Sequence, residues 1–102
     1  MSPARADFSV EFLPGAVRDL VDVPAEVREL ILDTIDRELS RNPFPRVTLI
    51  KRLQGFRVPT YELRIRREVM NYRVVYRIEG RRVLILMIPP RRELDRHLRR
   101  LR

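Results

Sequence analysis

The sequence contains no cysteine and only one histidine, His97. Without cysteine the chain can form neither a disulfide nor a thiolate metal site, and it has no cysteine nucleophile. A single histidine argues against a histidine-based zinc site and against a serine–histidine–aspartate triad. The sequence therefore predicts a protein that uses no metal and no cofactor.

Long hydrophobic runs are also missing. The longest apolar stretch, residues 83–88, has the length of a β-strand, whereas a membrane-spanning helix needs about 20 apolar residues. The first residues, MSPARADFSVEF, contain no apolar segment of signal-peptide length. We therefore expect a cytoplasmic protein without a membrane partner. Its length predicts one domain over residues 1–102, with residues 1–6 flexible.

Lysine is almost absent, because Lys51 is the only lysine among 22 basic residues. The net charge of +8 is unevenly divided: residues 1–45 carry a net charge of −4 and residues 46–102 a net charge of +12. A basic half of this kind is typical of proteins that bind RNA, DNA or a very acidic protein. The planar fork of arginine suits phosphate. A GC-rich genome or a hot habitat would also favour arginine, but neither explains the clustering.

Hydrophobic periodicity predicts a strand and two helices in the first half. Residues 7–13, DFSVEFL, alternate apolar and polar side chains as a half-buried strand does. A short helix begins at Pro14. A longer helix has Pro24 at its first position, carries an apolar stripe and stops at Asn42-Pro43. The short link between these helices predicts an antiparallel helical hairpin.

The second half predicts a loop followed by three strands. Residues 44–59 are rich in turn formers, and we expect a loop there. The strands are TYELRIR, NYRVVYRI and VLILMI, and Gly80 allows a tight turn between the last two. VLILMI is apolar throughout, which predicts a central strand covered on both faces.

Residues 91–102 then form a basic C-terminal helix with leucines at helical spacing. The predicted fold is therefore α+β: an N-terminal strand, a helical hairpin packed on one face of a small, mainly antiparallel sheet, and a short C-terminal helix.

Side-chain parity places the arginines of the predicted sheet on one face. Along each strand, the tyrosines share the face that the helices would cover. The opposite face then carries Arg64, Arg66, Arg73 and Arg77. The flanking segments can bring Lys51, Arg52, Arg91 and Arg92 to the same surface. Because neighbouring like charges repel and only Glu62 interrupts them, we interpret this surface as a polyanion site. A solvated charged surface is the alternative.

The same segments resemble the RelE/ParE superfamily of bacterial and archaeal type II toxins. The residues that carry the resemblance are RNPFP, IKRLQG, TYELRI, NYRVVYRIEGRRVLILMI and PPRREL, and it extends from Phe8 to about Leu94. RelE-like members enter the ribosomal A site and cut mRNA, with the ribose 2′-OH attacking its own phosphodiester. ParE-like members inhibit DNA gyrase. The resemblance implies a toxin, for which we favour the RelE-like endoribonuclease and keep the gyrase inhibitor as the alternative.

The resemblance also implies partners and roles. The partners are a cognate acidic antitoxin, RelB-like or of another kind, and the ribosome with mRNA. Arg73 matches the sheet arginine that stabilises the phosphate, and Arg64 matches a basic position of RelE-like enzymes. Arg91 matches the basic residue after the last strand, a phosphate ligand or proton donor. RNA-backbone contacts are expected from Lys51, Arg52, Arg66, Arg77 and Arg92.

Two departures from the family pattern concern the catalytic groups. Glu62 replaces a lysine, and it is either a general base or an ion-pair partner of a neighbouring arginine. The C-terminal tyrosine that stacks on a base is absent, and Asp95 or His97 stands in its place. His97 is either an acid or base with a near-neutral pKa or a partly buried helix residue.

Overall fold

The computed structural model describes residues 7–67 and 70–102, and the flexibility predicted for residues 1–6 lies outside this part. The elements are β1 (Ser9–Phe12), α1 (Pro14–Val21), α2 (Ala25–Leu39), β2 (Ile50–Arg52), β3 (Tyr61–Arg67), β4 (Met70–Glu79), β5 (Arg82–Met87), the 3-10 turn η1 (Arg91–Glu93) and α3 (Leu94–Leu101). The predicted α+β fold is confirmed. None of the helices in the described part has both the length and the hydrophobicity to cross a membrane.

The strands form one sheet with the order β1-β5-β4-β3-β2. β1 pairs with β5 in parallel and the other neighbours are antiparallel, so the sheet is mainly antiparallel, as predicted. Arg64 of β3 lies opposite Arg73 of β4, and Glu62 lies opposite Val75. Glu62, Arg64 and Arg73 therefore project from the same face of two neighbouring strands.

Two strand predictions need correction. The segment predicted as a loop contains the edge strand β2, in which Lys51 pairs with Glu62 of β3. A strand of three residues among turn formers is too short to show alternation. The strand predicted to be central, β5, is interior but second in the order, because β1 pairs along its outer side and β4 occupies the middle.

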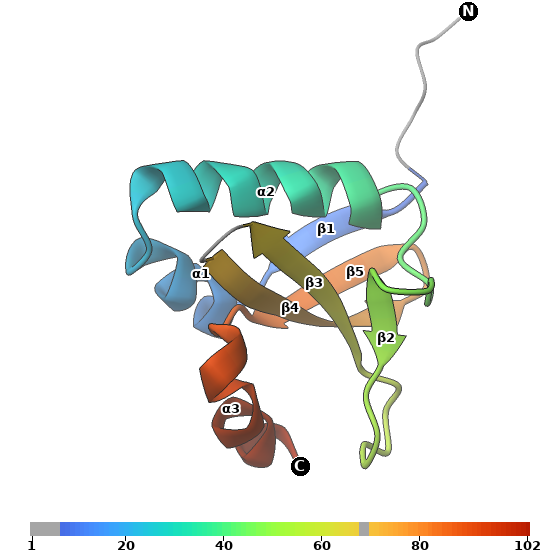
Figure 1. Ribbon diagram of the computed structural model, residues 1–102. Coiled ribbons are helices and arrows are strands. Elements are labelled where there is room, and N and C mark those ends of the chain that lie inside the picture. Colours follow the sequence, from blue (N-terminus) through green and yellow to red (C-terminus); the bar gives the residue numbers. More distant parts are fainter. Residues whose placement is uncertain (1–6, 68–69) are drawn as a thin grey trace, which may run out of the picture.

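The helix α2 covers one face of the sheet and builds the main core (Figure 1). Ile31 and Ile35 of α2 are buried against the tyrosine face of the sheet, beside Leu63 and Tyr76. The shorter α1 adds further core residues and packs tightly on β5. A Cβ at Gly15 would lie 2.9 Å from the backbone oxygen of Leu86, so this close approach requires glycine.

The C-terminal helix α3 lies on the opposite side of the sheet from α2 (Figure 1). Leu94 and Leu98 of α3 form a second, smaller core with Val75 of β4. Phe56, from the loop before β3, packs against the same group. The face predicted to be open and basic is therefore partly covered by the chain's own C-terminal helix.

A buried tyrosine fixes β4 to the segment that follows α2. Tyr76 is fully buried, and its hydroxyl donates a hydrogen bond to the backbone oxygen of Pro43 at 2.6 Å. Burial raises the pKa of Tyr76 above its ordinary value, so this hydroxyl stays protonated. Its ring stacks on that of Tyr61, with 5.6 Å between the centroids.

The Tyr76→Phe substitution should lower the free energy of unfolding by about 1–2 kcal/mol, because the buried carbonyl of Pro43 loses its donor. Denaturant unfolding followed by circular dichroism measures this difference. Tyr61→Phe is the control, because it removes a hydroxyl from the half-buried neighbour and should change the free energy by less than about 0.5 kcal/mol. Equal losses in the two variants would show that this hydrogen bond is not the source of the effect.

Candidate functional site

A cleft of about 620 Å³ lies between the sheet and α3, on the face away from α2. Of the described residues, the cationic side chains that line it are Lys51, Arg64, Arg66, Arg73, Arg91 and Arg102. Two carboxylates, Glu62 and Asp95, also line it. We call this space the basic cleft. Its excess of positive charge is suited to an anionic ligand.

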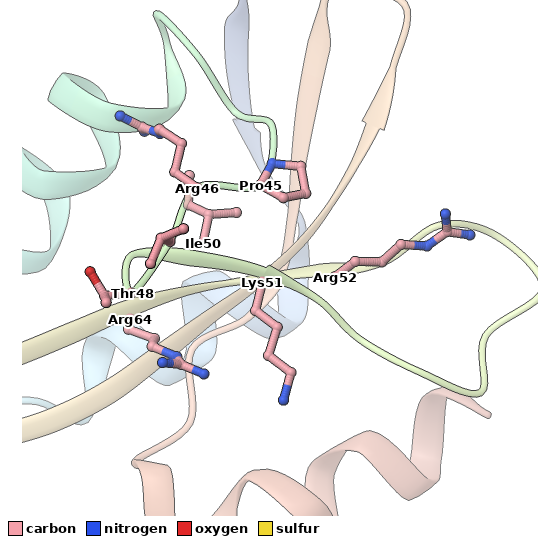
Figure 2. Close-up of a pocket in the computed structure, with 8 residues that line it drawn as sticks. Pro45, Arg46, Thr48, Ile50, Lys51, Arg52 and Arg64 are labelled. Carbon is pink, nitrogen blue, oxygen red and sulfur yellow. The ribbon is translucent and has the colours of Figure 1, made fainter.

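Strand geometry explains why these side chains meet. Glu62, Arg64 and Arg66 alternate along β3 and therefore share one face. Arg73 faces the same way from β4, and Lys51 does so from β2. Figure 2 shows Lys51 and Arg64 pointing toward α3 from these neighbouring strands.

Arg73 forms the floor of the basic cleft, because only 3% of its surface is exposed. Its Nη1 donates hydrogen bonds to Asn71 Oδ1 at 2.5 Å and to the Tyr72 backbone oxygen at 3.3 Å. Burial lowers the pKa of Arg73, Glu62 opposes this effect, and nearby arginines including Arg66 lower the pKa further. The carboxylate of Glu62 therefore offsets only part of the unfavourable effect that burial and the neighbouring arginines have on this guanidinium.

Glu62 is the buried carboxylate that separates two of these arginines. It is 3% exposed, and its Oε1 lies 3.5 Å from Arg64 Nε and 3.7 Å from Arg73 Nε. Among the described residues, no hydrogen-bond partner exists for Glu62 Oε2 or for either Nε atom. Buried polar groups are rarely left without a partner. The three atoms lie buried beneath the basic cleft, and the ion pairs of Glu62 with Arg64 and Arg73 offset part of the cost of their burial.

The structure places His97 outside the basic cleft. It lies on another side of α3, in a pocket with Asp19, Asp22 and Glu93. Its Nδ1 is 2.9 Å from the backbone oxygen of Glu93. The orientation of α3 follows from docking Leu94 and Leu98 on the sheet, and this orientation turns His97 away. Asp95 and His97 were the two residues that could stand in place of the missing C-terminal tyrosine, and of these Asp95 lines the cleft.

Three predicted RNA-binding arginines also lie apart from the basic cleft. Arg77 is partly buried, and its Nε donates to Thr60 Oγ1 at 3.0 Å, which fixes it near the start of β3. Arg52 points away from Lys51 along the loop before β3 (Figure 2). Arg92 is directed into solvent, with 86% of its side chain exposed. Six of the ten predicted site residues line the cleft in the described part: Lys51, Glu62, Arg64, Arg66, Arg73 and Arg91. Their chemical roles stay predictions.

Among the lining residues that the sequence reasoning did not single out are Asn71 and Arg102. Asn71 accepts a hydrogen bond from Arg73 through its amide oxygen and so orients that arginine. The sequence contained a sign of this contact, because residues two apart on a strand project from the same face. Arg102 lies at the C-terminal end of α3 and lines the basic cleft. Its guanidinium lies 5.2 Å from the centroid of the Phe56 ring and donates a hydrogen bond to the Gln54 backbone oxygen at 3.4 Å. Only the docking of α3 brings Arg102 there, so no local pattern could reveal it.

Two kinds of group are missing from the cleft within residues 7–67 and 70–102. No aromatic side chain lines it. The described residues also include no group of three or more histidine or acidic side chains that could hold a metal ion. The groups that the described cleft presents are guanidinium groups next to one buried carboxylate, and guanidinium groups can stabilise negative charge.

The Glu62→Gln substitution should destabilise the protein by about 3 kcal/mol, because it leaves Arg73 buried near Arg64 without the carboxylate between them. Inorganic phosphate should recover more stability in this variant than in the wild type, because the anion replaces the lost charge. Thermal unfolding with and without phosphate measures both effects.

Glu79→Gln is the matched control, because exposed Glu79 pairs with Arg82 on the surface. It should change stability by less than about 0.5 kcal/mol. A Glu62→Gln variant as stable as this control, or one that phosphate does not affect, would contradict the role of Glu62 as counter-charge.

Comparison with known proteins identifies the family. The family described as "ParE toxin of type II toxin-antitoxin system, parDE" matches residues 10–95. No curated protein matches the chain. Among solved structures, the chain is similar to the toxin–antitoxin complex RelBE2 from Mycobacterium tuberculosis, with 27% identity, a TM-score of 0.66, and 82% of this chain and 98% of that chain covered.

Two further structures share the fold. The archaeal RelE–RelB complex from Pyrococcus horikoshii has 24% identity and a TM-score of 0.64, with 83% of this chain and 96% of that chain covered. A mutant of the E. coli toxin RelE in the free state has 17% identity and a TM-score of 0.68, with 89% and 90% covered. Because the family match spans most of the sequence, the chain belongs to the ParE toxin family, within the RelE/ParE superfamily of type II toxins.

Proposed function

We propose that this toxin is a ribosome-dependent endoribonuclease that cleaves mRNA in the basic cleft. The observation that carries the proposal is the buried guanidinium of Arg73, which lies beside Arg64, Arg66 and Arg91 with one carboxylate among them. A phosphodiester supplies the negative charge that this arrangement lacks, and arginine binds phosphate oxygens in pairs. The choice of mRNA as substrate follows from the resemblance of the sequence to RelE-like toxins, whose fold the chain shares.

In the proposed reaction, the 2′ oxygen of a ribose attacks the adjacent phosphorus, and the bond from phosphorus to the 5′ oxygen breaks. The products are a 2′,3′-cyclic phosphate and a 5′-hydroxyl end. Arg73 and Arg64 stabilise the charge that develops on the phosphoryl oxygens. Glu62, the buried carboxylate that lines the cleft, accepts the proton of the 2′-OH. Arg91, at the entrance, donates to the leaving 5′ oxygen, which takes its proton from solvent.

Induced expression in bacteria should arrest growth and produce cuts in translated mRNA, mapped by primer extension. Arg73→Ala should reduce cleavage by about 100-fold or more, because it removes the central donor to the phosphate, and growth should recover. Arg99→Ala is the control, since it deletes an exposed arginine of α3 and should leave cleavage unchanged. Full arrest with intact transcripts would rule the proposal out.

A second candidate function is inhibition of DNA gyrase without nuclease activity. The family match to ParE toxins favours it, as does the lack of an aromatic ring to stack on a base among the described residues that line the basic cleft. Purified gyrase separates the two functions. If a modest molar excess of the protein stops supercoiling by gyrase and mRNA stays intact in cells, the protein is a gyrase inhibitor and the nuclease proposal fails.

We also infer a cognate antitoxin with an acidic segment that neutralises the basic cleft. The similar RelBE structures are complexes of toxin with antitoxin. A carboxylate-rich segment would satisfy the same charges as RNA phosphates do, so the two ligands compete.

Co-expression with the adjacent reading frame should yield a complex whose Kd rises about tenfold or more between 0.1 and 0.5 M NaCl, because exposed charge pairs are screened by salt. Isothermal titration calorimetry at the two salt concentrations measures this change. An affinity that is independent of salt would contradict an electrostatic mode of neutralisation.

A further inference from the structure

Lys51 differs chemically from the arginines that surround it in the basic cleft. It is the only lysine of the sequence. A guanidinium group stays protonated in proteins, whereas a lysine amine can lose its proton and then act as a nucleophile. Among the described side chains that line the cleft, Lys51 therefore presents the one primary amine.

The structure leaves this amine accessible. Lys51 is exposed on the edge strand β2. Glu62, its neighbour across the strand pair, is buried and forms its ion pairs with Arg64 and Arg73. Lys51 also lines a neighbouring hollow of about 440 Å³, and Figure 2 shows its amine directed away from β2 toward α3. The amine therefore stands where two spaces meet, and a small molecule can reach it from either one.

The arginines next to Lys51 can hold a phosphate beside the amine. Arg64 lines the same two spaces as Lys51, and Arg66 lines the basic cleft with them. Arginine binds phosphate oxygens in pairs. A small molecule that joins a phosphate to an electrophilic carbon would therefore bind with that carbon close to Lys51. Acyl phosphates are such molecules, because their phosphate is attached directly to a carbonyl carbon.

We propose that Lys51 is an acylation site, and that the basic cleft binds the acyl phosphate that modifies it. The neutral amine attacks the carbonyl carbon, and the bond from this carbon to the bridging oxygen breaks. Phosphate leaves with the electron pair of that bond, and the amine nitrogen gives its proton to solvent. The products are an amide on Lys51 and inorganic phosphate, so the step needs neither an oxidant nor a reductant.

Acylation would change the charge of the cleft. It converts the ammonium group of Lys51 into a neutral amide, whereas Glu62 and Asp95 keep their negative charge in the same space. The modified cleft should therefore bind RNA more weakly. This consequence rests on the proposed function, because it assumes that the cleft binds RNA, but the acylation itself requires only that the cleft binds phosphate.

A comparison of two acetylating reagents tests the site. The Arg99→Lys variant, made full-length by cell-free synthesis, carries a second amine at an exposed position of α3 outside the cleft lining. It is treated with acetyl phosphate or with N-acetoxysuccinimide, which is neutral and has no phosphate. Peptide mass spectrometry gives the acetylation rates at positions 51 and 99. The ratio of these rates should be about fivefold or more higher with acetyl phosphate, because only this reagent engages the arginines.

The ratio excludes a general difference in reactivity between the two amines, because such a difference affects both reagents. Excess inorganic phosphate should abolish the preference of acetyl phosphate for position 51. Adding Arg66→Ala to the same variant should reduce it about threefold or more, because one phosphate donor is lost. Equal ratios with the two reagents, or a preference that survives both treatments, would overturn the proposal.

Binding to a short 2′-O-methyl RNA, which lacks the attacking 2′-OH, tests the consequence. Complete acetylation of Lys51 should raise the Kd about fivefold at about 0.1 M NaCl and lower the slope of log K against log salt by about 0.7, because one phosphate contact is lost. The same treatment of the Lys51→Arg variant should leave its Kd unchanged, since this variant keeps the charge and has no amine at position 51. An unchanged Kd of the acetylated protein would contradict the effect on RNA binding.

The outcomes separate this inference from the proposed function. If transcripts stay intact during growth arrest but acetyl phosphate still prefers position 51, the nuclease proposal fails and the acylation site stands. If mRNA is cut but the two reagents give equal ratios, the nuclease proposal stands and the acylation site fails.

Discussion

The basic cleft depends on one electrostatic arrangement: a buried carboxylate between guanidinium groups that outnumber it. Glu62 keeps Arg64 and Arg73 close together on adjacent strands, where they would otherwise repel. It does not neutralise them, since more cations than carboxylates line the same space in the described structure. The folded state therefore retains an unsatisfied positive charge on a rigid sheet. An anion with paired oxygens matches the fork geometry of these guanidinium groups.

The docking of α3 turns this charged face into an enclosed site. Leu94 and Leu98 cover only the part of the face around Val75, and the arginines beside that patch then have a wall opposite them. Enclosure lowers the local dielectric constant, so each charge interaction within the cleft is stronger than on an open sheet. The same docking sets which C-terminal side chains take part: Asp95 and Arg102 line the cleft, and His97 does not.

Most of the fold followed from local patterns in the sequence. The alternation in TYELRIR and NYRVVYRI predicted which side chains face the helices, and Leu63 and Tyr76 are indeed in the main core. The same alternation predicted that Glu62, Arg64 and Arg73 project from the opposite face. The strand β2 could not be predicted because three residues show no period, and it exists only through its pairing with β3.

The limits of prediction at the site have a common cause. The position of His97 depends on the rotation of α3 on the sheet, and the separation of Arg77 from the cleft depends on its bond to Thr60. Both depend on tertiary contacts between different segments of the chain. Side-chain alternation, in contrast, predicts only the two faces of a single strand. The role of Asn71 is the intermediate case, since its spacing from Arg73 was visible but its bond was not.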